Sequence, residues 1–230
     1  MLDKEKAVVI KGIAATFVML GHILNEADWY IQIFFLGALW VGVFFFYSGY
    51  GLQYSFEKKD NYLSGFVKNK VVSVFIPFIF AEMLYYLIVC GVENKHFSIG
   101  EIILCSLGIK LSNPVLWYVV EILFIYLLFY IVKRLEIVFN KDLSCIWIMV
   151  YVIFVCVAVA VDAGISWYVS TSAFVIGMYI TKIQEKLGTI GNTKKTRFLC
   201  CFIFITGYFY FRYLALMNRS LGQTVRKLTD

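Results

Sequence analysis

Long runs of apolar residues, separated by short polar segments, make up most of the chain. Seven runs are about as long as the roughly 20 residues that a membrane-spanning helix needs. They cover residues 8–25, 31–55, 71–92, 115–132, 143–161, 164–181 and 198–217. Membrane strands would instead show short segments of alternating polarity. The pattern therefore predicts an all-α protein, a polytopic bundle of about seven transmembrane helices.

One further apolar segment, from Phe97 to Leu111, does not fit this series. It is shorter than the seven runs and contains Glu101 and Lys110. Charged residues are costly in the hydrocarbon core, and a short helix of this kind commonly lies in the interface. We therefore expect this segment to lie at the membrane surface or to re-enter it, without crossing.

Composition agrees with the pattern and excludes a soluble domain. Hydrophobic residues make up 61% of the 230 residues, charged residues only 16%, and the mean hydropathy is +0.80. The net charge of +6 would be compatible with nucleic-acid binding in a soluble protein. Here the basic residues lie mainly between apolar runs, which the positive-inside rule explains. We expect a lipid bilayer, and no nucleic acid, as partner.

The basic segments also predict the orientation. They alternate along the chain so that a cytoplasmic N-terminus places them on the cytoplasmic side of a multi-pass cell-membrane protein. They are Lys4 and Lys6 before the first run, Lys58, Lys59, Lys68 and Lys70 after the second, Lys133, Arg134 and Lys141 after the fourth, and Lys182, Lys186, Lys194, Lys195 and Arg197 after the sixth.

Two ionisable residues in the first run call for an explanation. Lys11 and His22 are eleven residues apart, which on an α-helix is three turns plus about 20°, so they share a face about 16 Å apart along the axis. With a cytoplasmic N-terminus, Lys11 lies near the inner surface and His22 in the outer half of the membrane. One alternative is that Lys11 extends its amine to the interface while His22 joins a local polar network.

Other polar residues inside the runs are candidates for structural or chemical roles. Glu82 and Glu121 are expected to be buried carboxylates, and Glu121 would pair with a cation, with His22 or with another group inside the bundle. Ser48 and Gly49 are small enough to let two helices approach closely. The six cysteines show no metal-ligand spacing, and we expect no metal.

Several motifs occur in the order found in one family. The residues are Lys11 and His22 with ten residues between them, Phe45, Phe46, Ser48, Gly49 and Tyr50 in the second run, Lys70 and Pro77 in a basic segment leading to a proline, Trp117 and Glu121, and Phe174 and Gly177. From about residue 8 to 182 the chain thus resembles the membrane-bound acyltransferase 3 family, whose members O-acylate bacterial surface polysaccharides and other extracytoplasmic acceptors.

The resemblance implies a donor, an acceptor and roles for particular residues. The donor would be cytoplasmic acetyl-CoA, and the acceptor a hydroxyl of an extracytoplasmic glycan. Imidazole titrates near neutral pH, so His22 is the candidate base, with Glu121 as a second catalytic candidate. Lys11, Lys68 and Lys70 are cationic groups for the phosphates of the donor. For Lys68 and Lys70, positive-inside topology is the alternative explanation.

The chain departs from the family pattern in two places. Ser73 stands where the family usually has a second arginine, and the chain has fewer spans than the family's usual ten or so. We expect residues 1–230 to form a single acyltransferase-like domain that lacks the last spans. Two other functions remain open: a truncated, non-catalytic remnant that binds a membrane partner, and a small transporter using Glu82, Glu121 and His22 as a proton relay.

Overall fold

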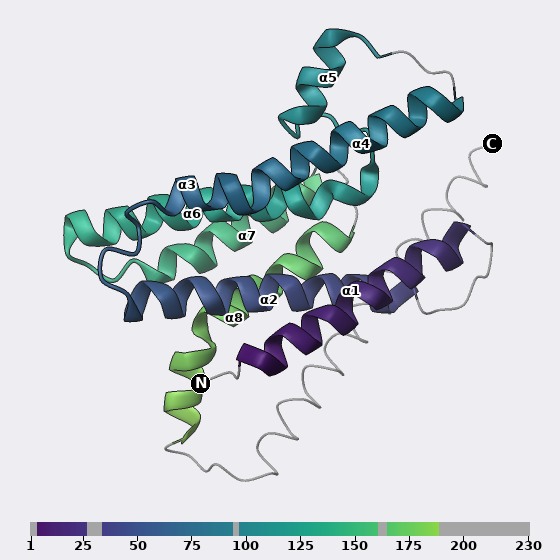
Figure 1. Cartoon of the computed structure of the whole chain (residues 1–230). Coiled ribbons are helices and arrows are strands. Elements are labelled where there is room, and N and C mark those ends of the chain that lie inside the picture. Colours follow the sequence, from purple (N-terminus) through teal and green to yellow (C-terminus); the bar gives the residue numbers. More distant parts are fainter. Residues whose placement is uncertain (1–3, 27–33, 94–96, 161–164, 189–230) are drawn as a thin grey trace, which may run out of the picture. The chain divides into compact units, whose positions relative to one another are not determined.

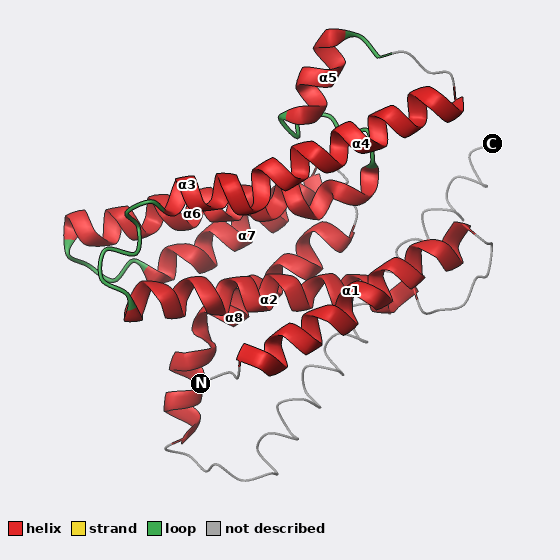
Figure 2. Ribbon diagram, in the orientation of Figure 1, coloured by secondary structure: helices red, strands yellow, loops and turns green. Residues whose placement is uncertain are grey.

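A computed structural model describes residues 4–26, 34–93, 97–160 and 165–188, and over these ranges every regular element is a helix (Figure 2). The all-helical prediction is therefore confirmed for the described part of the chain. The helices are α1 (Lys4–Glu26), α2 (Phe34–Lys58), α3 (Phe66–Lys70), the π-helical η1 (Val71–Phe75), α4 (Ile76–Glu93), α5 (Ile99–Ser106), the 3-10 helix η2 (Pro114–Leu116), α6 (Trp117–Phe139), α7 (Ser144–Ala160) and α8 (Ile165–Gly188).

Helix length and composition show that this is a membrane protein. Three helical stretches among the described residues are long and apolar enough to cross a bilayer: Glu5–Leu24, Phe66–Glu93 and Pro114–Phe139. Cys145–Ala160 and Ser170–Ile180 are shorter apolar helices. The described part of the chain thus supports three candidate spans, and the expected number of seven is not established. The seventh expected span, 198–217, lies outside the described residues.

The third apolar run begins with a widened turn. α3, η1 and α4 follow one another without a break, and in η1 the N–H of Ile76 donates to the carbonyl oxygen of Val71, a π-helical bond. A proline in a helix lacks an N–H, and its ring clashes with the carbonyl four residues earlier, which for Pro77 is that of Ser73. A π turn relieves such crowding and is frequent at functional sites. This π turn, η1, begins directly after Lys70.

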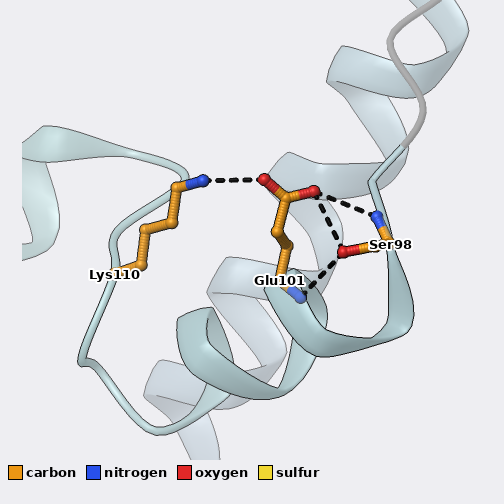
Figure 3. Close-up of polar contacts among 3 residues, drawn as sticks. All are labelled: Ser98, Glu101 and Lys110. Carbon is orange, nitrogen blue, oxygen red and sulfur yellow. Dashed lines mark hydrogen bonds and ion pairs between the residues drawn. The ribbon is translucent and has the colours of Figure 1, made fainter.

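The segment from Phe97 to Leu111 contains a short helix, α5, whose first turn is fixed by side chains (Figure 3). The Ser98 hydroxyl accepts from the backbone N–H of Glu101, and the Glu101 carboxylate accepts from the backbone N–H of Ser98 at 3.0 Å. This reciprocal capping box starts the helix. Lys110 then pairs with the same carboxylate at 2.8 Å. At eight residues, α5 is too short to cross a bilayer, as the sequence predicts.

α1 and α2 pack along one another (Figure 1). Ala14 of α1 is fully buried. Phe17 stacks on Trp40 of α2, with ring centroids 4.8 Å apart and an angle of 8° between the planes. This aromatic contact contributes to holding α1 against α2.

α2 approaches α8 through a reciprocal pair of glycines. A methyl group added at Gly49 would overlap the carbonyl oxygen of Phe174, and one added at Gly177 would overlap the carbonyl oxygen of Phe46. The two backbones are thus in direct contact, as small residues permit in membrane helices. The close approach expected at Ser48 and Gly49 is confirmed for Gly49, and Gly177 is its counterpart on α8.

Aromatic rings fill the space where α3, α6, α7 and α8 meet. Phe129, fully buried, contacts Phe66 at 5.9 Å and Trp147 at 6.2 Å between ring centroids, and Trp147 contacts Phe174 at 5.8 Å. Aromatic pairs at such distances add to the stability from burial alone. This cluster packs around the middle of α6.

Lys133 corrects one part of the sequence prediction. It was expected in a polar segment after the fourth run, but α6 continues to Phe139 and Lys133 is 2% exposed. Its amine pairs with Glu136 at 2.7 Å and lies 4.9 Å from the ring centroid of Phe56. A buried cation requires such partners. Lys133 is therefore an internal ion-pair residue and does not belong among the solvated charges of a loop.

Candidate functional site

A cavity of about 640 Å³ lies between α1, α2 and η1. α1 contributes Lys11 with its neighbours, and the other walls come from the middle of α2 and from the widened turn before Pro77. Its lining consists of Val8, Lys11, Gly12, Phe44, Tyr47, Ser48, Ser73 and Val74. We call it the Lys11 cavity.

The polar groups of the Lys11 cavity favour an anionic ligand. Lys11 is half-buried and supplies a cation, and Tyr47, Ser48 and Ser73 supply hydroxyl groups. None of the lining residues is acidic. Ammonium and hydroxyl donors without a competing carboxylate form strong hydrogen bonds with an anion such as phosphate.

Tyr126 of α6 connects this cavity to Lys70. Its hydroxyl donates to the Ser48 Oγ at 3.1 Å, and the Lys70 Nζ lies 4.2 Å from the centroid of its ring. Because Ser48 accepts from Tyr126, its own hydroxyl hydrogen remains available to a ligand. The cation–π contact places Lys70 against the same side chain. A single buried tyrosine thus positions both a hydroxyl and a cation.

Lys70 lines a second cavity of about 320 Å³, next to the first. Ser73 lines both cavities. Lys68, the third lysine expected to contact a donor, is exposed and lines neither. The structure therefore brings Lys11 and Lys70 to adjacent cavities and leaves Lys68 at the surface.

His22 lies on the same helix as Lys11 and is exposed. The helix is continuous between the two residues, which sets them about 16 Å apart along its axis. His22 does not line the Lys11 cavity. A ligand held at Lys11 would have to extend along α1 to reach the imidazole.

The two carboxylates expected inside the bundle are buried, and each bonds to a hydroxyl. Glu82 is 2% exposed and accepts from the hydroxyl and backbone N–H of Ser112. Glu121 is 3% exposed and accepts from the Thr171 hydroxyl. Among the described residues, one carboxylate oxygen of each, Glu82 Oε1 and Glu121 Oε2, has no hydrogen-bond partner. Glu121 is thus tied to α8 rather than to a cation in this part of the chain.

Sequence reasoning missed Tyr126, Ser112 and Thr171. Tyr126 and Thr171 each place a hydroxyl inside an apolar run, and such a group requires a partner when buried. That requirement could have singled them out. Their partners could not have been found in this way, because Ser48 is 78 residues from Tyr126 and Glu121 is 50 residues from Thr171.

Comparison with protein families identifies the family of the chain. A family model described as an acyltransferase domain, that of the acyltransferase 3 family, matches residues 8–225. No curated protein and no solved structure matches significantly. The matched range includes both cavities, the Gly49–Gly177 crossing and the buried carboxylates. The chain therefore belongs to the acyltransferase 3 family.

Proposed function

We propose that this protein is an integral membrane O-acyltransferase that transfers an acetyl group, or a related acyl group, from cytoplasmic acetyl-CoA to a hydroxyl of an extracytoplasmic glycan. The Lys11 cavity is the observation that carries the proposal, because it offers a cation and three hydroxyl groups without a carboxylate. Acyl-CoA carries several phosphate charges, and such groups bind them well. Membership of an acyltransferase family supports the same chemistry.

The orientation follows from the basic segments. With the N-terminus in the cytoplasm, Lys11 and Lys70 face the compartment that contains the donor. The donor enters at the Lys11 cavity and extends along α1 toward His22. This direction brings the thioester to the part of the membrane from which an extracytoplasmic acceptor would approach.

The transfer step needs a base close to the thioester. The acceptor oxygen attacks the carbonyl carbon, a C–O bond forms, the C–S bond breaks, and CoA leaves as a thiolate. His22 takes the hydroxyl proton during the attack and returns it to the departing sulfur, so that the products are the ester and CoA thiol. Lys11 and Ser48 hold the donor. Glu121 lines neither cavity and, through its hydrogen bond from Thr171, connects α6 to α8.

Acetyl-CoA binding to the full chain in detergent tests the donor assignment. Lys11→Ala is expected to weaken binding by roughly tenfold to a hundredfold, because it removes a charge-assisted contact of about 1.5–3 kcal/mol. Lys68→Ala is the matched control, since Lys68 is exposed and lines neither cavity, and it should bind like the natural protein. If neither the natural chain nor the variants bind, a non-catalytic remnant becomes the better explanation.

The assignment of His22 as the base is tested separately, by measuring both donor binding and acyl transfer. His22→Ala should bind the donor normally, because His22 does not line the cavity. Transfer to the acceptor in cells should fall by about 10²–10⁴-fold, the usual contribution of a general base. Full acetylation by the variant would show that another group takes the proton.

A further inference from the structure

Helix α5 carries a row of exposed apolar residues that the proposed transfer reaction does not use. Ile99, Ile103 and Leu107 follow one another at intervals of four residues, so they lie on one face of the helix. They are 79%, 53% and 56% exposed. We call this row the α5 stripe. An exposed apolar patch of this kind marks a surface that contacts another molecule or a membrane.

The side of α5 opposite to the stripe faces the rest of the chain. Cys105 is 6% exposed. Glu101, four residues before it and half-buried, pairs with Lys110 of the following loop at 2.8 Å (Figure 3). On a surface helix of a soluble protein the arrangement is the reverse, with apolar residues toward the protein and charged residues outward. The medium outside the α5 stripe is therefore expected to be apolar.

Two contacts tie the segment around α5 to α4. Before the helix, the ring centroid of Phe97 lies 5.0 Å from that of Tyr86. After it, the backbone N–H of Ser112 donates to the carboxylate of Glu82 at 3.2 Å. Glu82 and Tyr86 precede Glu93, the end of α4, by eleven and seven residues, which is about 16 and 10 Å along the helix axis. The segment therefore returns alongside α4 and does not lie beyond its end.

α4 supplies the apolar surface next to the α5 stripe. It is part of the candidate span Phe66–Glu93, and its residues Leu84 and Leu87 are exposed. Exposed apolar residues of a spanning helix contact the acyl chains of the lipids. These two leucines lie in the same stretch of α4 as the two contacts of the α5 segment. The α5 stripe is thus an extension of the surface that this span presents to the bilayer.

We infer that the α5 stripe is inserted among the lipid acyl chains near the C-terminal end of α4, so that α5 anchors the chain in one leaflet. Interfacial amphipathic helices bury their apolar face by about 5–10 Å in this way, while the polar face stays among the headgroups. Glu101 and Lys110 are the only charged residues from 97 to 111, and they neutralise each other. Apolar burial alone therefore holds the segment, whatever the charge of the headgroups. The inference does not depend on the proposed function.

Lipids with a photoactivatable acyl chain test this inference on the full chain in lipid nanodiscs. After illumination, mass spectrometry measures the label on each peptide. The peptide with residues 97–111 should be labelled as strongly as α4, whereas residues 59–65, between α2 and α3, should remain unlabelled. The label should be the same with neutral and with anionic lipids, and a requirement for anionic lipids would contradict the inference. If 97–111 is labelled no more than 59–65, the inference is wrong, and cover by a second copy of the chain would give this result.

Cysteine reactivity measures the same surface from the aqueous side. In nanodiscs, Ile103→Cys should react with a water-soluble maleimide at least about tenfold more slowly than Lys58→Cys, because a thiolate forms poorly in apolar surroundings. Lys58 is exposed at the end of α2, and Leu87→Cys on α4 is the matched lipid-facing control. Peptide mass spectrometry separates the introduced thiol from the natural cysteines. If Ile103→Cys reacts as fast as Lys58→Cys, the α5 stripe lies in water and α5 is not an anchor.

Discussion

Two neighbouring residues of α2, Ser48 and Gly49, lie on different sides of the helix and have different neighbours. Gly49 lies against the backbone of α8, where even a methyl group would overlap the carbonyl oxygen of Phe174. Ser48 faces the Lys11 cavity and accepts a hydrogen bond from Tyr126. Both residues are small, but for different reasons. Gly49 is required for packing, whereas Ser48 contributes a polar group to a cavity.

The comparison shows that one short motif need not have one role. The family resemblance includes Ser48 and Gly49 together, and sequence alone assigns both to close helix approach. The structure separates them because successive residues of a helix point about 100° apart. Substitutions at the two positions should therefore affect different properties, stability at Gly49 and donor binding at Ser48.

The largest effect on stability is expected at Gly49, on the side of α2 that packs against α8. Gly49→Val should destabilise the protein by about 3 kcal/mol or more, at the upper end of overpacking costs, since its neighbours are backbone atoms that cannot rotate away. Thermal unfolding in detergent measures it. Gly51→Ala is the control in the same helix, because a methyl group there meets no described atom within 4 Å. Equal stability of Gly49→Val and the natural protein would mean that α2 and α8 do not cross at this point.

A smaller effect is expected at Ser48, on the side of α2 that faces the Lys11 cavity. Ser48→Ala should lower the unfolding temperature less than Gly49→Val does, because it only removes the acceptor of the buried Tyr126 hydroxyl. It should weaken acetyl-CoA binding about threefold to tenfold, the value of one hydrogen bond. Tyr126→Phe should act in the same direction, because it removes the donor to Ser48 and keeps the ring that contacts Lys70. If either variant lowers stability as much as Gly49→Val does, the two sides of α2 are not separate.

The smallest effect is expected away from both sides of α2, at Glu101 of α5. The hydrogen bond from Lys110, together with the backbone N–H of Ser98, holds the pKa of this carboxyl below its ordinary value of 4.5. A lowered folded-state pKa stabilises the protein above the unfolded value, and this contribution disappears as the pH falls through the folded value. Lys110, whose pKa the same contact raises, stays protonated throughout that range, so the loss follows the titration of the carboxylate alone.

Unfolding temperatures at pH 7 and at pH 3 to 4 (about one unit on the acid side of the unfolded pKa) test this contact. Glu101→Gln should lower the unfolding temperature slightly at pH 7, and this difference should be smaller at the acid pH. Donor binding at pH 7 should be the same in both proteins. A difference that persists in full in acid would show that the capping hydrogen bonds, rather than the charge, carry the contribution.

The sequence predicted the helices and missed most of the polar partners. Apolar runs as long as a bilayer core leave the backbone no alternative to the helix, so 8–25, 115–132 and residues 144–160 of the run 143–161 are helical. The short segment with Glu101 and Lys110 was also recognised. The prediction failed at Lys133, because charge alone does not show whether a lysine faces solvent or an internal carboxylate such as Glu136.

The candidate site was predicted in part. Lys11 and Lys70 line adjacent cavities, and the burial of Glu82 and Glu121 agrees with their place in apolar runs. The catalytic role of His22 stays a prediction. Tyr126 and Thr171 were missed because their partners lie on distant segments.

By itself, the sequence determined that the chain is helical, that it belongs in a membrane and that it resembles one acyltransferase family. These properties depend on local composition and on motif order, both of which can be read directly from the order of the residues. The tertiary structure alone decided that Gly49 meets Gly177, that Thr171 bonds Glu121 and that Tyr126 connects Ser48 to Lys70. These contacts arise only when helices pack, because packing sets which side of each helix faces which neighbour.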